Sequence, residues 1–156
     1  YSLRNIETIA WTTLIFAIVL YISDKSRFDK KISSNLNIQS ILFIGIMQIL
    51  SLIPGVSRAG VTITAARILK FNRVDSSKIS FLLSIPALAG ASVLSLKDIF
   101  NQPTEFNYLV IIAIISSFIF SFLTVKYFLI FINKFSMNAF VIYRIIIALI
   151  LFSLIY

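Results

Sequence analysis

The sequence predicts an all-α, polytopic integral membrane protein that contains a re-entrant helix–loop–helix hairpin. Hydrophobic residues make up 59% of the 156 residues, whereas soluble domains are about half apolar. The mean hydropathy is +0.98, and most charged residues lie in short connectors between apolar runs. One apolar run is interrupted by Pro54-Gly55. Residues 1–156 are therefore expected to form a single membrane domain.

Four apolar runs are expected to cross the membrane, because a hydrocarbon core needs roughly 20 residues of helix. Asp75 or Ser76 is expected to cap the second of these helices. The expected spans cover about residues 5–22, 79–96, 108–125 and 139–156.

The charge distribution predicts which connectors share a side of the membrane. The net charge is +8, from 14 Lys and Arg against 6 Asp and Glu. Basic connectors at 23–37, 71–78 and 126–138 should face the cytoplasm, and residues 97–106 the other side. This pattern requires a hairpin at 38–70 to enter and leave from the same side. Because membrane topology explains the basic residues, nucleic acid is not an expected partner.

The residue types limit the chemistry. The sequence has no Cys and no His, which excludes disulfides and removes the commonest general base. None of the acids lies beside Arg58 in a predicted membrane segment, so no metal ligand and no acid–base couple is assigned. The acids are Glu7, Asp24, Asp29, Asp75, Asp98 and Glu105.

The hairpin is predicted to carry an anion-binding site at its tip. Proline and glycine break the first short helix after Ile53, and Ser57 can cap the second. Backbone N–H groups at that helix start carry partial positive charge. Arg58 can bind phosphate at two points, the Thr62 hydroxyl can assist, and Gly55 and Gly60 allow close approach of a ligand. The alternative is an ordinary turn outside the membrane with a solvated arginine.

Other polar residues have competing interpretations. Gln48 could line the cavity or make a helix–helix contact. Ser57 could be a nucleophile, although a helix cap that also binds a ligand oxygen is the commoner role. Arg67 is expected to reach the membrane interface with Lys70, and Arg144 is expected to snorkel to the interface rather than act in catalysis.

Three segments resemble one known family. Gln48 with Pro54-Gly55-Val56-Ser57-Arg58-Ala59-Gly60-Val61-Thr62 is similar to the P-G-x-S-R-S-G-x-T signature of the undecaprenyl pyrophosphate phosphatase family, known for bacitracin resistance. Ser80–Pro86 with Gly90-Ala91, and Phe140–Arg144, resemble two later segments of that family. The matches span nearly the whole chain, as the larger C-terminal part of a member would. Ala59 replaces the second serine of the signature.

The resemblance implies a multi-pass enzyme of the bacterial cytoplasmic (inner) membrane. Such enzymes dephosphorylate undecaprenyl diphosphate to undecaprenyl phosphate, which recycles the carrier lipid for cell-wall synthesis. This chain would supply the phosphate-binding half. By the resemblance, Arg58 and Ser57 are catalytic positions. The expected substrate-binding residues are Gly55, Gly60, Thr62 and Gln48.

The family also implies a divalent cation, Mg²⁺ or Ca²⁺, and an acidic E/Q-x-x-x-E signature. Both would depend on residues upstream of Tyr1, so this fragment alone is expected to be inactive. A lipid-phosphate or anion transporter or flippase is the alternative function, because broken helices also serve transporters. A catalytically inert fragment is the third hypothesis. Membrane lipids and a polyprenyl diphosphate are the expected partners, and a homodimer is left open.

Overall fold

The computed structural model describes residues 5–25, 28–100 and 108–155. These ranges contain helices and no β-sheet, as the sequence predicts for an all-α membrane protein. The elements are α1 (Ile6–Asp24), α2 (Ile32–Asn35), α3 (Ile38–Gln48), the 3₁₀ helix η2 (Ile49–Leu52), α4 (Arg58–Ile68), α5 (Arg73–Phe100), α6 (Tyr108–Lys134) and α7 (Asn138–Ser153).

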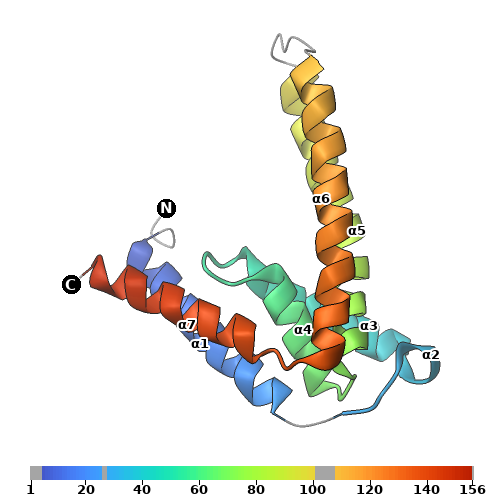
Figure 1. Ribbon diagram of the computed structural model, residues 1–156, viewed down its shortest axis with the longest axis vertical. Helices are drawn as coiled ribbons and strands as arrows, with labels where there is room; N and C mark the ends of the chain where they lie inside the picture. The colour runs from blue at the N-terminus through green and yellow to red at the C-terminus, as the bar shows by residue number, and fades with distance from the viewer. Residues whose placement is uncertain (1–4, 26–27, 101–107, 156) are drawn as a thin grey trace.

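Helices α1 and α7 form an antiparallel pair (Figure 1). The Trp11 and Phe152 rings meet at one end, with centroids 5.1 Å apart. At the other end, the N–H group of Met137 donates to the Asp24 carboxylate at 3.1 Å. Fully buried alanines on both helices, including Ala148, allow the close approach that helix packing in lipid favours.

Helices α5 and α6 form a second pair, which projects away from the rest of the chain (Figure 1). Helix α5 begins earlier than the predicted span at 79–96, and α6 continues beyond residue 125 to Lys134. The predicted cap at Asp75 or Ser76 is wrong. The Asn72 side chain instead accepts the Asp75 N–H at 2.8 Å, so the helix starts one turn sooner. Ile132 is the one buried residue of α6, as expected of a helix that faces lipid.

Within the described residues, three helices are long and apolar enough to cross a membrane: Ile6–Asp24, Arg73–Ser95 and Tyr108–Lys134. Helix α7 begins where the span at 139–156 is predicted and ends at Ser153. Most of the predicted connector at 97–106 lies outside the described residues.

The predicted hairpin at 38–70 begins and ends with its two arms close together. Helix α3 and η2 lead to the tip, and α4 returns from it (Figure 1). Ile32 and Leu36, which precede α3, pack with Phe71, which follows α4, in one apolar cluster. The Ile32 N–H also donates to the Asp75 carboxylate at 3.1 Å. The two ends of the hairpin are therefore joined.

Helix α4 lies at the centre of the fold. Every residue from Val61 to Arg67 is buried, and the helix contacts α1, α3 and α5. The hydroxyls of Thr62 and Ser80 lie 2.6 Å apart and link α4 to α5. A break in a helix is tolerated at membrane depth when protein surrounds it, and this packing supplies protein around the returning arm.

An ionic cluster holds the base of the hairpin. It consists of Asp24, Arg67 and Arg73, and we call it the basal ion cluster. The Asp24 carboxylate is 2% exposed and lies 3.2 Å from Arg67 Nε and 2.8 Å from Arg73 Nε. Arg67 lies at the base of the hairpin, away from the tip, and its side chain is 1% exposed because the protein buries it. Asp24 and the Phe71 carbonyl, 2.8 Å from Arg67 Nη1, supply buried partners.

Candidate functional site

The hairpin tip comprises residues 53–57 and the first turn of α4. Ser57 has extended backbone angles, and its Oγ accepts the Gly60 N–H at 3.2 Å. The predicted N-cap is therefore confirmed, and α4 begins at Arg58. The first N–H groups of a helix have no partner within it and carry partial positive charge. The tip therefore presents a cationic side chain beside a helix N-terminus.

Two threonines of α1 hold the tip in place. Thr12 Oγ1 donates to the Pro54 carbonyl at 2.7 Å, and Thr13 Oγ1 donates to the Gly55 carbonyl at 3.2 Å. At 1.5 Å per residue, these threonines lie about 17 Å along α1 from Asp24. The hydrocarbon core of a bilayer is about 30 Å thick. The tip is therefore separated from the basal ion cluster by roughly half of that thickness.

Gly55 is required by this docking. Its φ angle is +88°, and a Cβ there would lie 2.7 Å from the Ile9 carbonyl oxygen and closer still to Thr12 Oγ1. Both the backbone conformation and the contact with α1 exclude a side chain.

We expect Gly55→Ala to destabilise the protein by more than the roughly 1–2 kcal/mol that a left-handed alanine costs. The collision with α1 adds to this backbone term. Gly45→Ala is the matched control, because nothing lies within 4 Å of a Cβ at that helical position, and it should stabilise by roughly 0.5–1 kcal/mol. Thermal unfolding in detergent measures both. Equal melting temperatures for the two variants would contradict the docking.

Arg144 joins the tip, and its predicted interfacial position is wrong. The side chain is 9% exposed, and Nη2 donates to the Gly55 carbonyl at 3.0 Å. A Cβ on Gly60 would lie 3.0 Å from Arg144 Nη1, so the guanidinium lies between Gly55 and Gly60. Arg144 lies six residues into α7, about 9 Å along the helix from its start. At that position its side chain reaches the carbonyl of Gly55.

The predicted site residues separate into two groups. Ser57 is exposed and Arg58 is partly buried, and both lie at the tip with the two glycines. Thr62 is 1% exposed, and its hydroxyl pairs with Ser80 instead of facing the tip. Gln48 ends α3 and is partly buried, and within the described residues its Oε1 is buried without a hydrogen-bond partner.

The sequence could have indicated Arg144 more strongly than it did. An arginine inside an apolar run is by default a candidate functional residue, and Arg144 lies well inside α7. The adjacent hydroxyls of Thr12 and Thr13 carry no such signal, because threonine in an apolar helix usually bonds to its own backbone. Thr12 does this as well, donating to the Thr8 carbonyl at 2.9 Å.

The tip is electropositive. Among the described residues, the carboxylates in ion pairs are Asp24 and Asp75, and both lie at the base of the hairpin. In the same ranges, Arg144 Nη1 is buried without a hydrogen-bond partner. A buried cation without a counter-charge is costly, and an anion bound at the tip would reduce that cost.

The described residues do not fit a divalent-cation site. Within residues 5–25, 28–100 and 108–155, no three His, Cys, Asp or Glu side chains lie together. Mg²⁺ and Ca²⁺ take oxygen ligands, chiefly carboxylates, and the tip offers two guanidinium groups instead. No chemical step through a metal ion is derived from these residues.

The fold and the tip define a class: a polytopic membrane protein that presents two arginines and a helix N-terminus at the end of a re-entrant hairpin. The chain belongs to the bacitracin resistance protein BacA family, whose profile matches residues 1–150.

The chain also resembles proteins named undecaprenyl-diphosphatase. It is 70% identical over 153 residues to the one from Pelagibacter ubique, which covers 98% of this chain and 60% of the relative. The match to the Elusimicrobium minutum protein is 44% identical and covers 91% of this chain and 54% of that relative. The match to the Alcanivorax borkumensis protein is 38% identical and covers 93% and 55%. The chain thus spans little more than half the length of these relatives.

Proposed function

We propose that the protein containing this chain removes the terminal phosphate of undecaprenyl diphosphate and yields undecaprenyl phosphate. The observation that carries this proposal is the placement of Arg58 and Arg144 together at the tip of the hairpin. The names of the relatives, each an undecaprenyl-diphosphatase, give the substrate. In this proposal the chain supplies the phosphate-binding part and lies in the bacterial inner membrane.

The diphosphate is proposed to bind at the start of α4. Arg58 can present two parallel N–H donors to phosphate oxygens, and it stands at the start of α4, where the first N–H groups of the helix can also bind an anion. Arg144 already donates Nη2 to the Gly55 carbonyl and retains Nη1 for a phosphate oxygen. Ser57 Oγ accepts the Gly60 N–H, which leaves its own proton for the ligand.

The tip stabilises charge in this mechanism. Phosphoryl transfer depends mainly on positioning and on neutralising the charge of the transferred group, and both arginines serve that need. The attacking water and its base are proposed to depend on groups other than the ion-paired Asp24 and Asp75. A divalent cation is part of the proposal only through ligands outside the described residues. Pairing of two copies is a further proposal that the mechanism does not require.

Phosphate release from undecaprenyl diphosphate by the full-length protein in detergent tests the proposed reaction. We expect inorganic phosphate and undecaprenyl phosphate in equal amounts. Detergent micelles have no two sides, so a transporter or flippase would release no phosphate in this assay. Intact substrate after incubation with folded protein would overturn the hydrolase and favour transport, which broken helices also serve.

A further inference from the structure

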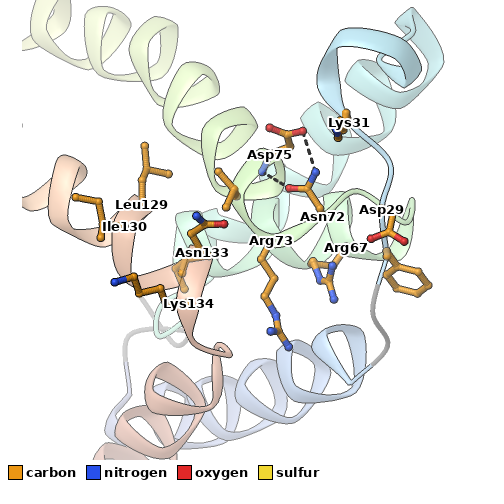
Figure 2. Close-up of a pocket in the computed structure, with 13 residues that line it drawn as sticks. Asp29, Lys31, Arg67, Asn72, Arg73, Asp75, Leu129, Ile130, Asn133 and Lys134 are labelled. Carbon is orange, nitrogen blue, oxygen red and sulfur yellow. Dashed lines mark hydrogen bonds between the residues drawn. The ribbon is translucent and has the colours of Figure 1, made fainter.

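A cavity of about 720 Å³ opens at the base of the hairpin, far from the tip. Its walls come from the start of α5, the end of α6, the connector before α2 and the end of α4 (Figure 2). This volume is within the range of small-ligand sites. None of the residues proposed for the diphosphate lines it.

The cavity carries excess positive charge. Arg67 and Arg73 share one carboxylate, that of Asp24, so the basal ion cluster retains one net positive charge. Figure 2 shows these two arginines side by side on one wall. Arg73 keeps its side chain 30% exposed. The exposed Lys31 and Lys134 also line the cavity and add two positive charges.

The acids of the cavity only partly offset this charge. Asp75 accepts hydrogen bonds from Ile32 N–H and Asn72 Nδ2 and lies 3.9 Å from Lys78 Nζ. Its charge is therefore matched locally. Asp29 is an exposed carboxylate that removes one unit. Three positive charges against this one leave a net charge of about +2, which is complementary to a phosphate group.

One wall of the cavity is apolar and continues onto the lipid-facing surface of α6. It is made by Leu129, Ile130 and Ile132, and Ile130 is 48% exposed. Tyr127, which is 63% exposed, lies one turn earlier on the same helix. Tyrosines and lysines on a membrane helix mark the headgroup level. The cavity thus combines a cationic rim at headgroup depth with an apolar face along which an acyl chain can lie.

We propose that this cavity binds the headgroup of an anionic phospholipid from the leaflet on the side of the basic connectors. Basic pockets between membrane helices on that side are suited to anionic headgroups. The apolar wall selects a lipid over a free phosphate ion, because a small soluble anion gains nothing from Leu129 or Ile130. The bound lipid holds the base of the hairpin and leaves the tip open.

Native mass spectrometry of the full-length protein tests this proposal. The protein is equilibrated in detergent with equal amounts of dioleoyl-phosphatidylglycerol, which is anionic, and dioleoyl-phosphatidylcholine, which has the same acyl chains and a zwitterionic headgroup. We expect wild-type protein to retain phosphatidylglycerol preferentially. The preference should fall about fivefold for each lysine removed in Lys31→Gln and Lys134→Gln. Both lysines are exposed, so neither change removes a buried contact.

Lys126→Gln is the matched control, because it removes the same charge from an exposed position of α6 that does not line the cavity. It should keep the wild-type preference. Equal retention of the two lipids by wild-type protein would overturn the proposal, as would an unchanged preference after both cavity lysines are removed. Loss of the preference on addition of millimolar inorganic phosphate would also overturn it, because that result would assign the site to a soluble anion.

Discussion

Replacing Arg58 with alanine is expected to lower the kcat/KM for phosphate release by about a hundredfold or more. Removing one preorganised donor from a water-poor site typically costs two to three orders of magnitude in rate. Arg58 stands at the first position of α4, at the tip, where the side chain and the helix N-terminus can act on one phosphate group. Phosphate release from undecaprenyl diphosphate by the purified full-length variant measures the loss.

Two further variants distinguish the contribution of the planar Arg58 guanidinium from that of its positive charge. Arg58→Lys keeps a cation but loses the planar pair of donors, so its activity should lie between the wild type and the alanine variant. Lys126→Ala removes an exposed cation on α6, distant in sequence from the tip, and should retain wild-type turnover. If Arg58→Ala turned over substrate as fast as Lys126→Ala, the role given to Arg58 would be wrong.

The second large effect is on stability. We expect Asp24→Asn to lower the free energy of unfolding by about 3–5 kcal/mol, the usual cost of removing one partner from a buried ion pair. The substitution keeps the shape of the side chain but leaves Arg67, 1% exposed, beside Arg73 with no negative charge between them. It also weakens the hydrogen bond from the Met137 N–H to the carboxylate. Equilibrium unfolding in mixed detergent micelles measures the change.

Asp29→Asn is the matched control, because it removes the same charge from an exposed position close in the chain. Surface substitutions of this kind usually change stability by less than about 0.5 kcal/mol. Adding Arg73→Gln to the Asp24→Asn variant should recover part of the loss, since it removes one of two like charges. Equal stability of Asp24→Asn and Asp29→Asn would show that the basal ion cluster does not hold the hairpin.

Local signals in the sequence predicted the hairpin well. A proline–glycine break, a serine able to cap and two short apolar arms predicted the turn near Pro54 and the cap at Ser57, and the structure has both. The distribution of basic connectors predicts that both arms of the hairpin reach the same side of the membrane, and this stays a prediction. These features depend on residues close in sequence or on total charge, which a single sequence displays directly.

Partners that depend on helix packing could not be predicted in the same way. Arg67 and Arg144 were expected at the interface, and each has a partner on another element, the buried Asp24 for the first and the Gly55 carbonyl for the second. The Thr62 hydroxyl was expected at the ligand and instead pairs with Ser80. In each case the outcome depends on which helices are neighbours, and periodicity and composition do not specify that.

The central claim is that the hairpin tip holds the diphosphate between Arg58 and Arg144. An experimental structure of the full-length protein with a non-hydrolysable undecaprenyl diphosphate analogue tests it most directly. The account predicts phosphate oxygens within hydrogen-bond distance of the Arg58 guanidinium and of Arg144 Nη1. A diphosphate bound at the base of the hairpin, beside Arg73 and Lys134, with the tip empty, would contradict it.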